Sequence, residues 1–177
     1  SRGAMPPRPP ANAEVALSVY ELHGASGVNA MTRAAGLGGA YHVGVEVYWL
    51  EWSFGWCEEG TGVYMVHVGQ STLGSFRERI PLGRTPYGPA GVLKILDSFR
   101  RTWDGGSYDL LRKNCSHFSA EFVKRLRVAE APSWVSSLAW AGDALISRLG
   151  VKGAMDAAKA ALPSASARAA PAVARFA

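Results

Sequence analysis

Hydrophobic and polar residues alternate along several short stretches of the chain, as they do in β-strands. Residues 41–48 (YHVGVEVY) place a valine at every second position. In a strand the valines share one face, and His42, Gly44 and Glu46 share the other. Residues 15–20 (VALSVY) form a short apolar run that is also typical of a strand. Further strands are predicted at residues 63–68 and 77–82.

Two later stretches repeat hydrophobic residues at intervals of three and four, the spacing of one helix face. The first spans residues 89–103 and is followed by Gly105-Gly106, which predicts that the helix ends there. The second follows Asn114, a residue type that caps helix N-termini, so Cys115 is predicted to be the first helical residue. A third amphipathic helix is predicted over residues 133–149, packed back on the core.

These elements predict an α+β domain in which an antiparallel sheet packs on helices. A chain of 177 residues, with 48% hydrophobic and 19% charged residues, fits one globular domain with tails. We place the domain at residues 13–150. Residues 1–12 are proline-rich and residues 151–177 are alanine-rich, and both compositions predict disorder.

Charge and cysteine content narrow the possible functions. The net charge is +5, but the lysines and arginines are scattered, which argues against nucleic-acid binding. The two cysteines form no disulfide framework and, without clustered histidines, no zinc site, so neither a metal nor a cofactor is expected. No apolar run approaches the ~18 residues of a membrane span and no signal peptide is recognised. We therefore expect a cytoplasmic protein, extending to the nucleus, and leave its oligomeric state open.

Cys115 is the first candidate for chemistry. At a helix start its thiol lies among unpaired amide groups and at the positive end of the helix dipole, which favours the thiolate. The alternative is a small buried hydrophobic residue, and this stretch alone leaves both interpretations open.

His42 is the second candidate, because it follows a glycine-rich loop and begins a strand. A thiol and an imidazole are the elements of a thiol-protease dyad, in which the imidazole takes the thiol proton and later protonates the leaving amine. The backbone amide of Cys115 is a natural oxyanion donor. The histidine precedes the cysteine, the reverse of papain-like enzymes, which fits a circular permutation.

Four aromatic residues crowd around Gly55, and they are Trp49, Trp52, Phe54 and Trp56. In one interpretation they pack in the core. In the other they wall a substrate cleft together with Asn114. The sequence leaves both interpretations open.

Three further residues rank lower as catalytic groups. His117 follows Cys115 by two positions, about 200° around the helix axis, and is expected to point away from it. Cys57 lies in an aromatic and acidic loop that disfavours a thiolate. His67 lies within a predicted strand and is expected to be structural.

Several motifs occur in order along the chain. They are Gly36-Leu37-Gly38, Tyr41-His42, Gly44-Val45-Glu46-Val47-Tyr48, Glu51-Trp52, Phe54-Gly55, Leu82-Gly83-Arg84-Thr85, Asn114-Cys115-Ser116-His117-Phe118-Ser119, Ala131-Pro132-Ser133-Trp134-Val135 and Leu138-Ala139. Together, at this spacing, they resemble the PPPDE family of permuted papain-fold peptidases, also called desumoylating isopeptidases. The resemblance covers about residues 15–149.

The resemblance implies a Cys–His isopeptidase or deubiquitinase-type hydrolase that acts on ubiquitin or SUMO-like conjugates, with Cys115 as nucleophile and His42 as base. We therefore expect these side chains about 3 Å apart or slightly farther. A narrow passage beside Cys115, walled by the aromatic residues near Gly55, is expected to admit the Gly-Gly end of a modifier. Departures lie beside the site: Trp49 replaces a usual glycine, and Ser116 stands where asparagine is common.

Two other functions remain open. Enzymes of the lecithin:retinol acyltransferase type also carry an Asn-Cys-x-His-Phe motif after an upstream histidine, and an acyl thioester serves either chemistry. The run at residues 41–47 favours the peptidase family, and liposome flotation would test the lipid interpretation. The second alternative is a non-catalytic module that binds modifiers, which a thiol-reactive ubiquitin-type probe would distinguish from an enzyme.

Overall fold

Five antiparallel strands form one sheet in the order β4-β3-β2-β1-β5. In this computed structural model, residues 12–23, 29–30, 34, 39 and 41–135 are described. The strands are β1 (Glu14–Leu22), β2 (Tyr41–Val47), β3 (Leu50–Phe54), β4 (Val63–His67) and β5 (Gly74–Arg84). The strands predicted by alternation are therefore confirmed, and β2 lies at the centre of the sheet.

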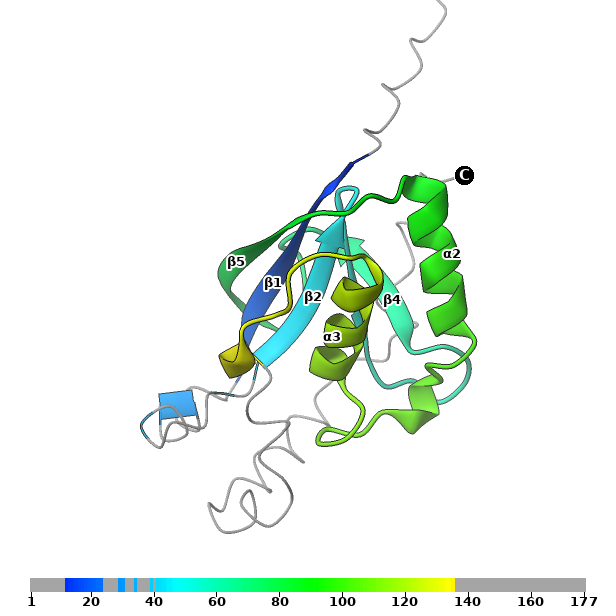
Figure 1. Cartoon of the computed structure of the whole chain (residues 1–177). Coiled ribbons are helices and arrows are strands. Elements are labelled where there is room, and N and C mark those ends of the chain that lie inside the picture. The colour runs from blue at the N-terminus through cyan, green and yellow to red at the C-terminus, as the bar shows by residue number, and fades with distance from the viewer. Residues whose placement is uncertain (1–11, 24–28, 31–33, 35–38, 40, 136–177) are drawn as a thin grey trace, which may run out of the picture.

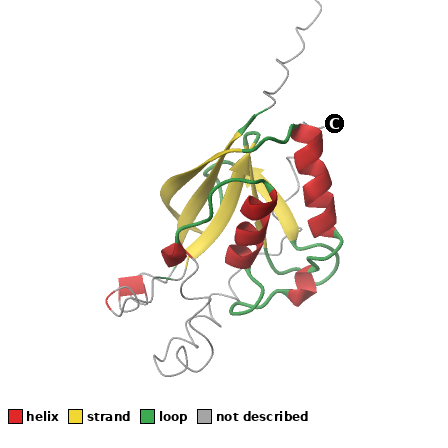
Figure 2. Cartoon of the chain, viewed as in Figure 1, coloured by secondary structure: helices red, strands yellow, loops and turns green. Residues whose placement is uncertain are grey.

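The helices α2 (Pro89–Arg100) and α3 (Cys115–Arg125) enclose the hydrophobic core against one face of the sheet (Figures 1 and 2). α3 packs on β2 and β3. The valines of β2 meet Phe99 of α2 and Phe118 and Phe122 of α3 in this core. The ring of Phe118 lies 5.1 Å from that of Phe99, edge to face. The predicted α+β class, with an antiparallel sheet packed on helices, is confirmed.

The prediction that α2 continues to the glycine pair was wrong. The helix ends at Arg100, and Gly105–Ser107 form a short 3₁₀ helix, η1. The Asp104 carboxylate caps η1 by accepting from the Gly106 amide at 2.8 Å. A Cβ on Gly105 would collide with Cys57 Sγ, so that glycine permits a close approach between two segments.

Two other predictions fall largely beyond the residues that the structure describes. Of the helix expected over residues 133–149, only residues 133–135 are described, and they are helical. The segments expected to be disordered, residues 1–12 and 151–177, lie outside the described residues except for residue 12.

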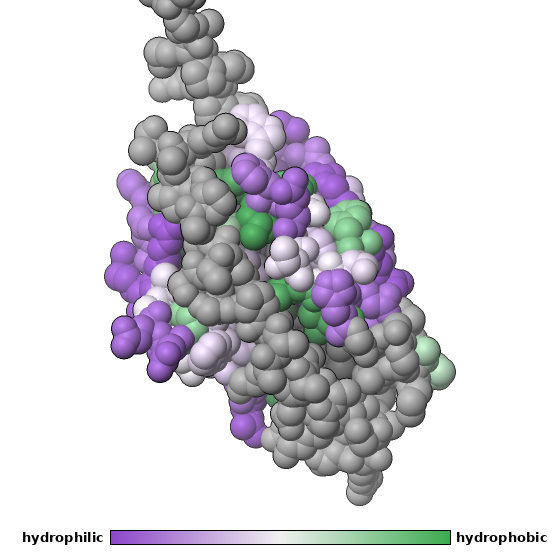
Figure 3. Space-filling view, turned by 180° about the vertical axis from the view of Figure 1, so that it is seen from behind, coloured by the Kyte–Doolittle hydropathy of each residue, from purple (hydrophilic) through white to green (hydrophobic). Residues whose placement is uncertain are grey.

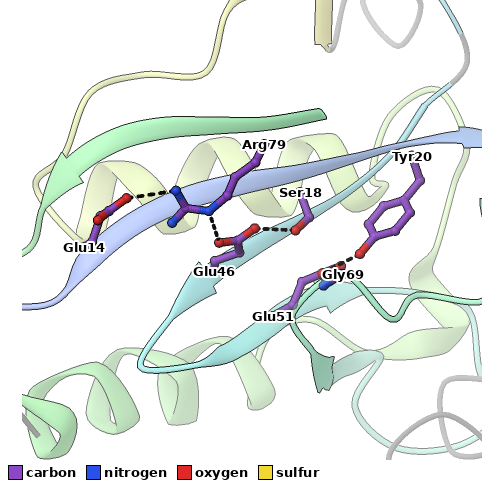
Figure 4. Close-up of polar contacts among 7 residues, drawn as sticks. All are labelled: Glu14, Ser18, Tyr20, Glu46, Glu51, Gly69 and Arg79. Carbon is purple, nitrogen blue, oxygen red and sulfur yellow. Dashed lines mark hydrogen bonds and ion pairs between the residues drawn. The ribbon is translucent and has the colours of Figure 1, made fainter. Parts of the chain in front are cut away.

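The face of the sheet opposite the helices carries buried polar side chains (Figure 4). Glu46 accepts from Ser18 Oγ at 2.6 Å and from Arg79 Nε at 2.6 Å, and Arg79 also donates to Glu14 at 2.9 Å. Because Glu46 is only 5% exposed, these donors offset the cost of burying its charge.

Glu51 lies fully buried on the same face. Its Oε2 accepts from Tyr20 OH at 2.6 Å and from the Gly69 amide at 3.1 Å, whereas Oε1 has no hydrogen-bond partner. The carboxyl fills the space beside Gly44, where a Cβ would collide with it. Burial raises the pKa of Glu51, and the hydrogen bonds from Tyr20 and Gly69 oppose this effect without cancelling it.

We predict that the free energy of unfolding of Glu51→Gln, measured relative to that of the wild type, increases as the pH rises. A carboxyl whose folded pKa exceeds its unfolded value of about 4.3 binds its proton more tightly in the folded chain. The wild type therefore loses stability as pH rises above about 4, through the raised folded pKa, and the amide variant does not. Urea unfolding from pH 4 to 8 measures the difference. Glu58→Gln, at an exposed site, is the control, and a flat difference for Glu51→Gln would contradict the argument.

The β2–β3 hairpin turns through Tyr48 and Trp49, which have φ angles of 51° and 64°. Bulky side chains rarely adopt this left-handed conformation, and two-residue hairpin turns favour asparagine and glycine. The buried Tyr48 is held there because its hydroxyl donates to the Tyr87 carbonyl at 2.8 Å. Trp49 is 68% exposed, so its side chain adds little packing to offset the strain.

We predict that Trp49→Gly is more stable than Trp49→Ala by about 1 kcal/mol. Both variants remove the indole, and only glycine relieves the left-handed strain. Chemical unfolding of the two variants isolates that difference. Equal stabilities would show that the turn is not strained at this position.

Candidate functional site

The first turn of α3 is fixed by Asn114, as predicted. Its Oδ1 accepts from the amides of Ser116 at 2.9 Å and His117 at 3.1 Å, and its Nδ2 donates to the Leu110 carbonyl at 2.6 Å. Cys115 is consequently the first residue of the helix. The cap accepts from Ser116 and His117 rather than from the Cys115 amide.

His117 belongs to this cap. Its Nδ1 lies 2.8 Å from Asn114 Oδ1 and 3.4 Å from the Asn114 amide, and one nitrogen cannot donate to the first and accept from the second. The shorter contact assigns the proton to Nδ1. Burial lowers the pKa of His117 and so favours the neutral ring, and Asp109 opposes this with a smaller effect. In a capping box the third helical residue, usually Glu or Gln, accepts from the N-cap amide instead, so no familiar sequence pattern indicated this contact.

Cys115 lies buried against the start of β2. Its Sγ is 4.0 Å from the carbonyl oxygen of Tyr41, and the residue is 6% exposed. Burial raises the pKa of the thiol, and the amides of Val43 and Ser116 only partly oppose it. The helix start acts in the expected direction, but desolvation outweighs it, so the resting thiol is neutral rather than the thiolate expected from sequence.

We predict that alkylation of Cys115 by iodoacetamide, in a Cys57→Ser background, has its pH midpoint above the ordinary thiol value of about 8.5. Burial disfavours the thiolate, so the reactive form is populated only at higher pH. Mass spectrometry of the modified peptide across pH 6–10 gives the midpoint. A midpoint near pH 6 would instead indicate a resting thiolate–imidazolium pair.

His42 lies on β2 between the two residues whose backbone meets Cys115, Tyr41 and Val43. The imidazole is on the sheet face opposite the valines, and the residue is 3% exposed. Its Nε2 lies 3.2 Å from the hydroxyl of Tyr64 on β4. The centroid of the Tyr20 ring, on β1, lies 5.8 Å from the centroid of the imidazole. No pattern along the chain indicated the Tyr64 contact, because β4 joins β2 only through β3.

Two of the cleft candidates are core residues. Trp52 is 3% exposed and Phe54 is 1% exposed, and both pack in the core cluster. The cleft interpretation was wrong for them because both alternate onto the helix-covered face of β3. Asn114 adjoins Cys115, but its amide is taken up by the helix cap and Leu110.

Trp49 is exposed but lies at the wrong end of β2. Residues 42 and 47 are separated by about 17 Å along a strand, and Trp49 follows the later one. A hollow of about 480 Å³ lies there, with Trp49, Val68 and Arg79 among its lining residues, and it does not include Cys115 or His42. Trp49 is therefore no wall of a cleft beside Cys115.

Other exposed hydrophobic residues are scattered. Trp56 is 37% exposed and Phe76 is 51% exposed. Seen from behind, the described surface has hydrophilic residues along its margins and small hydrophobic groups between them (Figure 3).

Cys57 is a packed thiol. Its Sγ lies 3.3 Å from the Glu59 carbonyl and 3.4 Å from the Thr61 carbonyl, which would repel a thiolate, and the residue is 3% exposed. Within the described part of the chain, no group of three or more potential metal ligands occurs. Among the same residues, no helix is long and apolar enough to cross a membrane.

Comparisons with known proteins place this arrangement in a family. Residues 13–149 match the model of the PPPDE putative peptidase domain. A DeSI-like protein of Arabidopsis thaliana is 33% identical over 130 residues, covering 73% of this chain and 56% of that protein. The desumoylating isopeptidase 1 homolog of Caenorhabditis elegans is 28% identical over 132 residues, covering 71% of this chain and 38% of that protein.

The DeSI-like protein sdu1 of Schizosaccharomyces pombe is 30% identical over 132 residues, covering 73% of this chain and 65% of that protein. The chain thus spans less than two thirds of the length of each of these three relatives. The family match nevertheless includes the whole of the described sheet and both helices. The chain belongs to the PPPDE peptidase family.

Proposed function

We propose that the chain is a cysteine isopeptidase that releases SUMO or another ubiquitin-like modifier from lysine side chains, with Cys115 as nucleophile and His42 as base. The observation that carries the proposal is the contact between the first residue of α3 and the backbone on both sides of His42. A relative named as a desumoylating isopeptidase homolog supports the substrate class. Both cysteines are buried and neither forms a disulfide, which fits a reducing compartment such as the cytoplasm or nucleus.

The reaction begins from a neutral thiol. As Sγ attacks the carbonyl carbon of the isopeptide bond, His42 Nδ1 takes the thiol proton, because Nε2 faces Tyr64. The imidazolium then donates this proton to the departing lysine amine, leaving a thioester on Cys115. Water, deprotonated by His42, hydrolyses the thioester and releases the modifier with a free carboxylate. The imidazolium then returns the proton to the departing Cys115 thiolate, which restores the neutral thiol.

The oxyanion formed in each step needs a hydrogen-bond donor. The Cys115 amide is at the first helical position, and the Asn114 cap does not use it. The positive end of the α3 dipole lies at the same point and favours the developing negative charge. Both groups are in place before the substrate binds.

A panel of fluorogenic substrates linked to SUMO, ubiquitin or other modifiers tests the proposal, with Cys115→Ala as the blank. Release of one modifier by the wild type, but not by Cys115→Ala, would support the proposal and identify the modifier. Cleavage that persists in Cys115→Ala would overturn it. Hydrolysis of acyl thioesters or phospholipids, without cleavage of any modifier, would replace it with an acyl-transfer function.

A further inference from the structure

The hydroxyl of Tyr64 lies 3.2 Å from Nε2 of the His42 imidazole, within hydrogen-bonding distance. Resting on the proposed function, we propose that Tyr64 is a positioning residue. Its hydroxyl accepts the Nε2–H of His42 and so holds the imidazole in the tautomer whose Nδ1 lone pair takes the Cys115 proton.

The contact is built into the sheet. Tyr64 is placed by pairing with Ser53 of β3, and Ser53 Oγ donates to the Val43 carbonyl at 2.7 Å, next to His42. The rings of His42 and Tyr64 lie nearly parallel, at 13°, with centroids 6.5 Å apart. Each residue is 3% exposed, so water does not compete freely for the hydrogen bond.

The direction of the hydrogen bond decides the chemistry. A hydroxyl can donate or accept, so the pair has two possible arrangements. If Tyr64 donated to Nε2, the neutral ring would carry its proton on Nδ1 and could not accept from a thiol there. If Tyr64 accepts, Nδ1 is a base, and the imidazolium formed after proton transfer keeps its Nε2–H bonded.

The groups around His42 supply a matched control. Tyr20 of β1 and Tyr64 of β4 flank the imidazole, and Cys115 of α3 meets the backbone on either side of His42. The Tyr20 ring lies 5.8 Å from the imidazole, but its hydroxyl donates to Glu51 at 2.6 Å. Tyr20→Phe therefore removes a buried phenol oxygen beside His42 without removing a hydrogen bond to the ring.

The first test uses nitrogen-15 NMR of the histidine rings in the full chain, with His42→Ala to assign the signals. The neutral His42 of the wild type is expected in the Nε2–H form, and a neutral Nδ1–H form would overturn the proposal without any Tyr64 variant. In Tyr64→Phe the single tautomer is expected to give way to a mixture. In Tyr20→Phe it is expected to persist, even though the melting temperature falls.

The second test is kinetic. In Tyr64→Phe, kcat is expected to fall on the order of 10- to 100-fold, the effect of one hydrogen bond to an ionised group, with KM little changed. Unchanged kcat with an unchanged tautomer would overturn the proposal. If the wild type cleaves no modifier-linked substrate, the proposed function fails, whereas the NMR tautomer still decides the role of Tyr64.

Discussion

Cys115→Ala is expected to abolish modifier release, with kcat reduced by a factor on the order of 10⁴ or more. Alanine has no nucleophile, so no thioester can form. His42→Ala is expected to have a comparable effect, because the buried thiol is neutral at rest and needs a base during attack. The cleavage rate of each variant is measured with the modifier-linked substrate that the wild type cleaves.

The two losses are expected not to add. Residues that act as one unit lose nearly all of their joint contribution when either is removed. The double variant should therefore be no slower than the single variants. Cys57→Ala is the matched control, since its thiol packs against loop carbonyls away from the proposed chemistry, and it should keep its kcat. An additive double variant would indicate that Cys115 and His42 act independently.

Trp52→Ala is expected to lower the free energy of unfolding by about 3–5 kcal/mol, the cost of removing a large buried aromatic side chain. Trp52 is 3% exposed, pairs with Val45 of β2 and Met65 of β4, and has the Arg100 guanidinium over its ring at 5.5 Å. For a domain with a total stability of about 5–15 kcal/mol, this is a large fraction.

Chemical unfolding compares Trp52→Ala with Trp49→Ala, which removes the same side chain from an exposed turn and should cost far less. Turnover is then measured at a temperature where both variants are folded. Trp52→Ala should retain the wild-type KM there, because its side chain is part of the core. A raised KM with unchanged stability would restore the cleft interpretation.

Local patterns were sufficient for β1, β2, β4, β5 and the start of α3, whereas β3 lies in the aromatic stretch that the sequence left open. Alternation along residues 41–47 placed the valines on the core face, because successive side chains of a strand point to opposite sides. Asn114 determined the first helical residue, because a cap acts on amides two and three positions away. The end of α2 was missed, because the glycine pair belongs to a separate turn. Asp104 accepts from the Gly106 amide there, and Gly105 packs closely against Cys57.

The protonation state of the proposed nucleophile depended on the tertiary structure. Helix position favours a thiolate at Cys115, but burial by surrounding segments outweighs that local effect. Trp52 and Trp49 looked equivalent in sequence, and only the sheet separated a core residue from an exposed one. Tyr64 meets His42 across an intervening strand, a contact that no spacing along the chain encodes. Capping and alternation act over a few residues, whereas desolvation and contacts between strands arise only when distant segments come together.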